Sequence, residues 1–404
     1  MLPGTINLTR KNPKEWVRYT HPEGAQYFCY RHALFLVYTD ANLYDSEILS
    51  KTEEFLRQVV GYVSRNEQKL HVVFDTKTID LVMDVTYSGS ELVCGYYFAH
   101  HPNQMIFWVD KFPASRRLWG DVKGVTSEQH ILHAMQAQYW EHRALFPCSH
   151  PLSQETVDQA RDILIHAIGD TSMSNTAICP YSTSEVERML AIIPSTVSGE
   201  KNPGLSRTVY RILKAFAAER FFHFHGETVA RLDFRKSAYN VPNSGSPRFA
   251  SRWFRFVSAL CFYAPHQHLK HIRDMFTDNL LNYPRWQQFN EKMVAEWTEV
   301  TLYSTVVLNA NTAFLSVQSV DSNPADSPNR IAVYITTFAS LGSITTGLLL
   351  LRMSKSKDVK RTLNLVKNDT GCMQMAVLHS LPYAFLLWSL ISFTAAFCLV
   401  CFIN

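Results

Sequence analysis

The sequence predicts an α+β protein with an N-terminal β-hairpin region, a mostly α-helical middle domain and C-terminal transmembrane helices. Three observations predict this class. Apolar and polar residues alternate before residue 120, apolar residues recur at helical spacing after it, and two long uncharged runs lie near the end. We therefore expect three regions, which cover residues 1–120, 121–290 and 291–404.

Short alternating segments predict the strands of the first region. They are LHVVFD at Leu70–Asp75, IDLVMDV at Ile79–Val85, CGYYFAHH from Cys94 and MIFWVD from Met105. Ser88-Gly89 and Pro102-Asn103 supply turns between them. One helix is expected here, from Asp45 to Arg65, because its apolar residues fall on one helical face.

The second region is predicted to consist of helices that begin at capping boxes. Thr126 with Gln129, and Ser182 with Glu185, place a hydroxyl three residues before a side chain that can bond back to the backbone. Apolar stripes at helical spacing follow, such as Val157, Ala160, Leu164 and Ile168. The segment 240–248, NVPNSGSPR, predicts a loop.

Two uncharged runs predict membrane-spanning helices. Residues 331–351 and 375–403 are long enough, as helices, to cross a hydrocarbon core about 30 Å thick. A helix also satisfies its own backbone polar groups where no water is present. The lipid bilayer is therefore the first expected partner of this chain.

A third span, residues 297–320, is predicted from the charges around the other two. The loop 352–374 is basic and should stay in the cytosol, whereas the stretch before residue 331 is weakly acidic. The first residues carry no apolar secretory signal, so three spans would keep the large N-terminal region in the cytosol. If 297–320 is instead a buried amphipathic helix, two spans remain and the N-terminal region would be translocated.

Cysteine and charge usage fit a cytosolic domain that does not bind nucleic acid. The eight cysteines show no paired spacing outside the last span, so no disulfide framework is expected. The net charge of +4 is small. Much of the basic excess lies in the loop 352–374, where it favours contact with anionic lipid.

Two aromatic units with the same spacing form a weak internal repeat. Tyr27-Phe28 stands eleven residues before Tyr38, and Tyr97-Phe98 stands eleven residues before Trp108. This spacing resembles the WW domain, a small three-stranded sheet that binds proline-rich peptides. The resemblance implies a proline-rich protein partner and a peptide-binding face. The residues of that face would be Tyr97, His101 and Trp108. The alternative is that both hairpins are purely structural.

A further set of longer segments is distributed along the chain. It includes HPEGAQYF, YTDANLYD, CGYYFAHH, AQYWEH and SLPYAFLLWSLISF. Through them, residues 16–404 resemble a group of uncharacterised multi-pass membrane proteins of mushroom-type fungi. That resemblance implies a fungal membrane protein with WW-like hairpins. It implies no activity.

Catalytic motifs are nearly absent from the sequence. Histidines cluster at His223 and His225, and again at His266, His268 and His271, but carboxylates at ligand spacing are scarce beside them. A polar helix surface is the preferred interpretation of both clusters. No catalytic residue, metal site or cofactor is predicted.

These features predict a membrane-anchored, non-enzymatic interaction protein whose cytosolic hairpins and helices bind a protein partner. The alternative is a subunit of an oligomeric pore or transport assembly. Such a pore would use polar residues at membrane depth, namely Glu299, Asn309, Asn311 and His379. A stripe of small residues, Ala339, Ser343 and Gly347, would support a homo-oligomer through the transmembrane helices.

Overall fold

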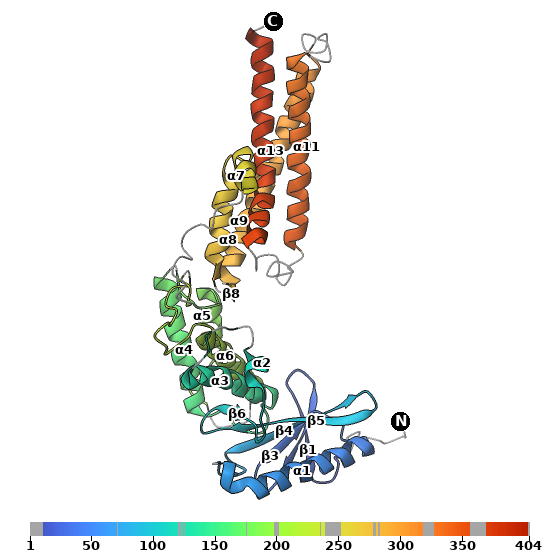
Figure 1. The fold of residues 1–404 in the computed structure, drawn as a ribbon, viewed down its shortest axis with the longest axis vertical. Coiled ribbons are helices and arrows are strands. Elements are labelled where there is room, and N and C mark those ends of the chain that lie inside the picture. Colours follow the sequence, from blue (N-terminus) through green and yellow to red (C-terminus); the bar gives the residue numbers. More distant parts are fainter. Residues whose placement is uncertain are drawn as a thin grey trace. The chain divides into compact units, whose positions relative to one another are not determined.

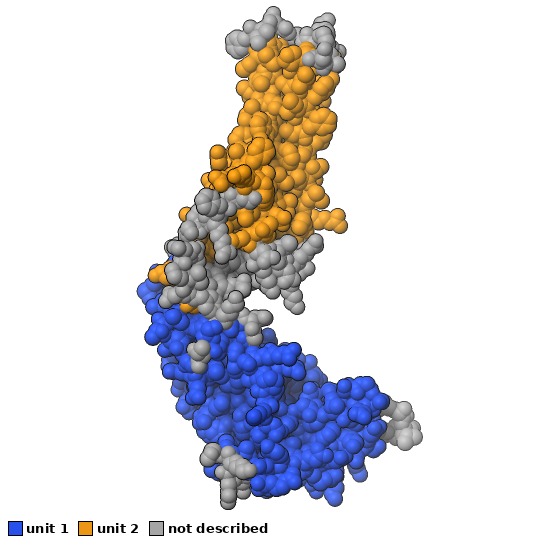
Figure 2. All heavy atoms as spheres, in the orientation of Figure 1, with its two compact units in different colours: residues 1–232 blue, residues 233–404 orange. Residues whose placement is uncertain are grey.

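The computed structural model describes residues 11–70, 72–119, 122, 124–125, 127–174, 176–197, 202–234, 236–238, 252–277, 280–281, 283–317, 327–355 and 369–402. The chain forms two compact units, residues 1–232 and 233–404, which Figure 2 colours blue and orange. Each unit has hydrophobic cores of its own. The boundary between them lies within the predicted helical region 121–290.

The N-terminal unit contains one six-stranded sheet in the order β1-β2-β3-β4-β5-β6. Its strands are β1 (Trp16–Thr20), β2 (Gln26–Arg31), β3 (Leu36–Thr39), β4 (Ile79–Ser88), β5 (Glu91–His100) and β6 (Met105–Phe107). Strands β1–β3 and β4–β6 form two antiparallel meanders, which the parallel pair β3–β4 joins. Helix α1 (Ser46–Leu70) connects β3 to β4, because parallel neighbours need a long crossover.

Both aromatic units of the sequence lie in this sheet. Tyr27 is on β2 and Tyr38 on β3, whereas Tyr97 is on β5 and Trp108 directly follows β6. The two meanders therefore share one continuous sheet, and their likeness to WW domains stays a prediction.

The two faces of the sheet enter different cores, because successive residues of a strand point to opposite sides. One face packs against α1, in a core that includes Phe28, Leu81 and Phe98. The other face carries Tyr38 and Val82, which pack against the residues that follow α3. Figure 1 shows α1 on one side of the sheet and α3 on the other.

Among the described residues, five further helices complete the N-terminal unit, and their apolar stripes form its largest core. They are α2 (Ala114–Leu118), α3 (Glu128–Leu145), α4 (Gln154–Met173), α5 (Thr183–Ile192) and α6 (Pro203–Phe222). The capping box of Ser182 and Glu185 is confirmed at the start of α5. Helix α3 is capped by Ser127, whose Oγ accepts from the Gln129 amide at 3.1 Å. The predicted cap Thr126 lies outside the described residues.

The segment Leu70–Asp75 is not a strand, so that prediction was wrong. Helix α1 continues to Leu70, and residues 72–75 are irregular. Phe74 instead fills a gap in the core, with its ring 5.7 Å from that of Phe98, while Val73 is 84% exposed. A loop that inserts one large side chain produces a short apolar run much like that of a strand.

The C-terminal unit is built on three long helices, α9 (Tyr283–Leu315), α11 (Pro328–Lys355) and α13 (Asp369–Phe402). A shorter pair, α7 (Arg252–Leu260) and α8 (Ala264–Met275), packs beside α13. The strands β7 (Phe276–Thr277) and β8 (Leu280–Leu281) form a small hairpin between α8 and α9. Figure 1 shows the long helices running side by side.

Hydroxyl and amide side chains join the long helices. Ser304 Oγ donates to Ser343 Oγ at 2.7 Å, and Ser343 Oγ donates to the Pro382 carbonyl at 2.8 Å. Asn311 Nδ2 donates to the Val333 carbonyl at 3.1 Å. The predicted small-residue stripe thus makes contacts within its own chain, and a homo-oligomer stays a prediction.

Within the part of the chain that the structure describes, two helices are long and apolar enough to cross a membrane, Pro328–Ser354 and Asp369–Cys401. They correspond to the predicted spans 331–351 and 375–403. Helix α9 contains the predicted third span 297–320 as far as Leu315 but is not among them, so a third span stays a prediction. Residues 318–326 and 356–368, which hold most of the charges used for orientation, lie outside the described residues, as does the loop 240–248.

The polar residues named for a pore lie on different sides of the helices. Asn311 and His379 are buried in the bundle, whereas Glu299 and Asn309 are exposed on its outer surface. A pore therefore also remains a prediction.

Candidate metal centre

A buried carboxylate lies in the middle of the sheet. Asp80 is the second residue of β4 and is 1% exposed. Because it alternates with Ile79 and Leu81, it points to the face opposite α1, where α3 and the segment after it cover the sheet.

Three histidines direct Nε2 at this one carboxylate. Asp80 Oδ2 lies 3.1 Å from Nε2 of His101, 3.0 Å from that of His142 and 3.2 Å from that of His150. His150 Nε2 also lies 3.3 Å from Oδ1. A carboxylate oxygen has two lone pairs, so three imidazole nitrogens crowd a single acceptor.

The register of the sheet explains the position of His101. Asp80 pairs with Ala99, and the His101 amide donates to the Thr78 carbonyl at 2.9 Å, just past the last strand pair. Residues Tyr97 and His101 are therefore the two diagonal neighbours of Asp80 on the same face. Diagonal neighbours lie within reach of long side chains.

The other two histidines come from α3 and the segment that follows it. His142 is in the last turn of α3 and is 1% exposed. His150 follows the helix by five residues, and Phe146 between them packs on Tyr38, with the rings 4.9 Å apart. The helix end and its following segment are thus held against the sheet.

Burial and the histidines act in opposite directions on Asp80. Burial alone raises the pKa of its carboxyl, but the imidazoles of His101, His142 and His150, which lie 3.0–3.2 Å away, outweigh burial and hold that pKa well below its usual range. Burial also lowers the pKa of His101 and of His142, although Asp80 opposes both shifts. These directions favour an ionised Asp80 carboxylate beside neutral imidazoles of His101 and His142, and neutral imidazole is the form that binds metals.

A second layer of hydroxyl groups orients the imidazoles. His101 Nδ1 lies 3.1 Å from the Tyr139 hydroxyl, and His142 Nδ1 lies 3.3 Å from the Tyr97 hydroxyl. Arg143 donates to the Tyr139 hydroxyl at 3.1 Å. Partners on Nδ1 fix the ring orientation and tautomer, as the outer contacts of metal-binding histidines do.

The donor set fits a divalent transition metal. The ligand atoms of Asp80, His101 and His150 all lie within 4.8 Å of one another. With metal–ligand bonds of about 2.0–2.2 Å, ligand atoms of one ion stand roughly 2.9–3.5 Å apart, which matches the 3.1 and 3.2 Å from Asp80 to the two histidines. His101 Nε2 is also buried without a hydrogen-bond partner among the described residues.

Only part of the predicted peptide-binding face lies at this centre. His101 faces Asp80, and the Tyr97 hydroxyl faces His142. Trp108 instead stacks on Phe112, with ring centroids 3.8 Å apart and an interplanar angle of 12°. Proline-peptide binding by Tyr97, His101 and Trp108 stays a prediction.

Sequence reasoning missed Asp80, His142 and His150. One signal was present, since Asp80 interrupts an apolar strand at a position that alternation assigns to the interior. The histidines gave no such signal, because 62 to 70 residues separate them from Asp80 along the chain.

The predicted histidine clusters lie elsewhere. Among the described residues, no group of three histidine, cysteine or acidic side chains other than Asp80, His101 and His150 approaches this closely. His223 bonds to Glu219 at 3.0 Å, and His268 packs near Phe289 in the C-terminal unit.

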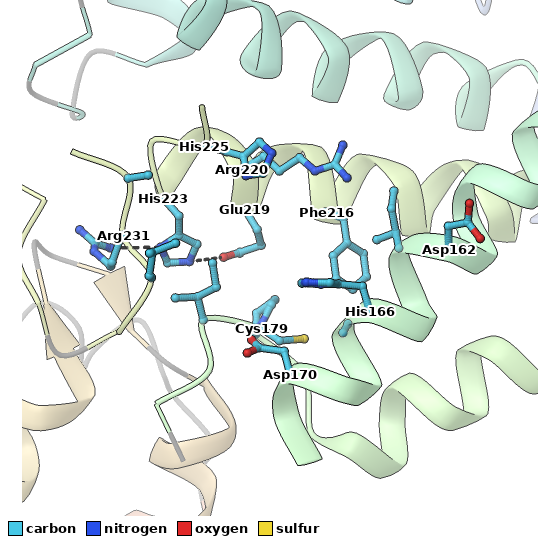
Figure 3. Close-up of a pocket in the computed structure, with 16 residues that line it drawn as sticks. Asp162, His166, Asp170, Cys179, Phe216, Glu219, Arg220, His223, His225 and Arg231 are labelled. Atoms are coloured by element: carbon cyan, nitrogen blue, oxygen red, sulfur yellow. Dashed lines mark hydrogen bonds and ion pairs between the residues drawn. The ribbon is translucent and has the colours of Figure 1, made fainter. Parts of the chain in front are cut away.

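A separate cavity of about 370 Å³ lies in the N-terminal unit between α4, α6 and the segment after α6. Figure 3 shows Asp162, His166 and Asp170 along one wall, with Glu219 and His223 opposite. Its charged groups bond partly to one another, since Arg231 donates to His223 Nδ1 at 3.3 Å and His223 Nε2 pairs with Glu219. Burial raises the pKa of the Cys179 thiol in its wall to about 11.

Comparison with known proteins gives no assignment: no family model, no curated protein and no solved structure matches this chain.

Proposed function

We propose that this chain is a membrane-anchored protein that binds a divalent transition-metal ion with Asp80, His101 and His150. One observation carries the proposal. Three imidazole Nε2 atoms stand 3.0–3.2 Å from one buried carboxylate oxygen, and the Nε2 of His101 has no hydrogen-bond partner among the described residues. An ion held by Asp80, His101 and His150 would give the Nε2 of His101 a partner.

The ligand types narrow the choice of metal. Two imidazoles and one carboxylate suit Zn²⁺ and Fe²⁺, whereas Mg²⁺ and Ca²⁺ prefer oxygen ligands alone. Three protein ligands leave at least one coordination position open, as in catalytic rather than structural zinc sites. Water or a small ligand would occupy that position.

His142 would act through Asp80. It is fully buried, donates toward Asp80 Oδ2 at 3.0 Å and holds the Tyr97 hydroxyl on its other nitrogen. A bond of this kind orients a ligating carboxylate without contacting the metal. His142 is therefore a positioning residue in this proposal.

The membrane anchor is the second part of the proposal. The helices Pro328–Ser354 and Asp369–Cys401 support it by their length and composition. A cytosolic N-terminal unit would place the centre where its buried cysteines stay reduced.

Elemental analysis of the full-length protein, purified in detergent without chelators and titrated with Zn²⁺ or Co²⁺, tests the metal site. We expect about one ion per chain, because the ligand set is a single cluster. His101→Ala and His150→Ala should lose the ion, and His142→Ala should weaken binding about 10–100-fold. His100→Ala is the matched control, since His100 neighbours His101 in the chain but its Nδ1 accepts the Asn103 amide at 3.3 Å rather than facing Asp80.

Two outcomes oppose the metal proposal. Wild-type protein that neither retains nor takes up an ion would make the cluster a purely structural hydrogen-bond network. Equal loss of metal in His100→Ala would show that binding depends on general folding rather than on these ligands.

We also propose a protein-partner function for the outer edge of the sheet, as the aromatic spacing suggested. Strand β6 is an edge strand, and the Trp108–Phe112 pair beside it is partly exposed. Proteins captured by the full-length chain should differ between wild type and Trp108→Ala, while the metal content stays equal. An unchanged set of partners would remove this function and leave the metal proposal intact.

A further inference from the structure

The tip of the α7–α8 hairpin is an exposed apolar surface beside a membrane-spanning helix. We propose that this tip, residues 256–263, inserts into the acyl region of the membrane and that the basic lower part of the hairpin contacts anionic headgroups. The inference rests on the proposed membrane anchor. The hairpin would then be a third membrane contact, one that dips into the bilayer without crossing it.

Direct contacts set the level of the tip along α13. The Trp388 indole Nε1 donates to the Leu260 carbonyl at 2.9 Å, and the Phe262 and Trp388 rings lie 5.5 Å apart. Trp388 lies 13 residues after Met375, where the uncharged run of α13 begins. At 1.5 Å per residue this is about 20 Å into that run.

The lower part of the hairpin follows the same helix toward the start of that run. His268 of α8 lies near His379, with rings 6.5 Å apart, and Met275 shares a core with Cys372. The hairpin thus runs along α13 from its first turn up to Trp388. The tip of the hairpin therefore lies beside the apolar run of α13, and the base of the hairpin lies beside the charged start of α13.

The exposed surface changes character along the hairpin. At the tip, Phe256 is 68% exposed and Tyr263 is 63% exposed, and Leu260 and Phe262 are exposed beside them. Toward the base, most exposed residues are polar or basic, namely Arg252, Arg255, His266, Gln267 and Lys270, although Trp253 there is also 39% exposed. An exposed aromatic tip beside basic residues is typical of segments that enter a membrane through their apolar side chains.

The backbone of the tip is prepared for a medium without water. Cys261, Phe262, Tyr263 and Ala264 donate their amides to Val257, Ala259, Ser258 and Cys261 at 2.7–3.2 Å. The indole of Trp388 satisfies the Leu260 carbonyl. Each of these bonds satisfies a backbone group that would otherwise be costly in the hydrocarbon region.

The turn between α7 and α8 places two aromatic residues at backbone dihedral angles that glycine adopts more readily. Phe262 and Tyr263 have φ of 52° and 61°, a region that glycine adopts far more readily than aromatic residues. Contacts made by the side chains can offset the backbone cost of such positions. Phe262 makes such a contact with Trp388, and insertion into lipid would supply one for the exposed ring of Tyr263.

Photo-crosslinking in nanodiscs of phosphatidylcholine and phosphatidylserine tests the insertion. Benzoylphenylalanine would replace Phe256 or Tyr263 in the full-length chain. Tyr87, which is 56% exposed on the β4–β5 hairpin, is the negative control, and Phe397, which is 51% exposed on α13, is the positive control. We expect lipid adducts from positions 256, 263 and 397 and only background from position 87.

The controls separate this inference from the membrane proposal. Adducts at 397 with background levels at both 256 and 263 would overturn the insertion and leave the anchor in place. Background levels at 397 as well would overturn the anchor itself. A crosslink from 263 to a second protein chain in place of lipid would assign the tip to an interface between copies.

Discussion

Asp80 is a carboxylate inside an apolar strand, so its replacement should affect stability as well as metal content. Asp80→Asn keeps the shape but removes the charge that three imidazoles face at 3.0–3.2 Å. We expect a loss of about 1–3 kcal/mol in unfolding free energy, because one of the two accepting oxygens becomes an NH2 group that cannot accept from the buried imidazoles. Thermal unfolding in detergent measures it as a lower melting temperature.

Asp84→Asn is the matched control for that substitution. Asp84 lies on the same strand, but it is exposed. Its replacement should leave the melting temperature nearly unchanged. Similar shifts in both variants would mean that the carboxylate of Asp80 is not held by the histidines as described.

Cys179 offers a pH-dependent test of the cavity between α4 and α6. Burial raises the pKa of its thiol to about 11, above the ordinary value near 9, so the folded protein holds it protonated at neutral pH. Because only the thiolate is alkylated, the rate with iodoacetamide should rise about tenfold per pH unit up to that pKa. Mass spectrometry of the Cys179 peptide follows the reaction, and the denatured chain provides the reference rate. Fast, pH-independent labelling at neutral pH would contradict the buried position.

At the scale of elements, sequence pattern and structure agree where the signal is local. Helix α1, the strands around Leu81 and Phe98, and the capping box at Ser182 follow from periodicity and short-range bonds. The segment Leu70–Asp75 gave a wrong strand prediction, because Phe74 is partly buried by contacts with Phe35 and Phe98 rather than by strand pairing. The metal centre could not be predicted for a related reason. The residues of the metal centre are brought together by the register of the strands and by the position of the end of α3. Sequence patterns predict neither of these.

Close helix packing in the C-terminal unit leads to a prediction for two glycines of α11. A Cβ at Gly347 would overlap Thr301 Oγ1 of α9, which its own bond to the Trp297 carbonyl, 2.7 Å long, holds in place. Gly347→Ala should therefore destabilise the helix pair by about 1–3 kcal/mol, the usual range for overpacking. Unfolding by sodium dodecyl sulfate in mixed micelles measures the change.

Gly342→Ala is the corresponding control on the same helix. A Cβ there would meet the Phe385 ring at 3.4 Å, which is close to ordinary contact and faces a side chain rather than a fixed hydroxyl. The two substitutions have the same helix propensity, so any difference reports packing alone. If Gly347→Ala proved the milder of the two, the close approach of α9 and α11 would be refuted.

At the scale of the whole molecule, the division into two units separates the proposed metal chemistry from the proposed anchor. All residues of the metal centre lie before residue 232, and both candidate spans lie after it. The N-terminal unit has its own sheet and cores, so neither its fold nor its ligands require the long helices. A fragment of residues 1–232 should therefore fold without detergent, whereas a fragment of residues 233–404 should need it.

The fragment also gives the sharpest test of where metal binding resides. Residues 1–232 should bind Zn²⁺ or Co²⁺ with the stoichiometry of the full chain, because every ligand and every oriented hydroxyl group of the centre is retained. Thermal unfolding with and without the ion should show a higher melting temperature when it is bound, since a ligand of the folded state stabilises it. Titration of the fragment beside its His101→Ala variant provides the comparison. A fragment that folds, as judged by circular dichroism, yet binds no metal while the full chain does would place the ion outside Asp80, His101 and His150.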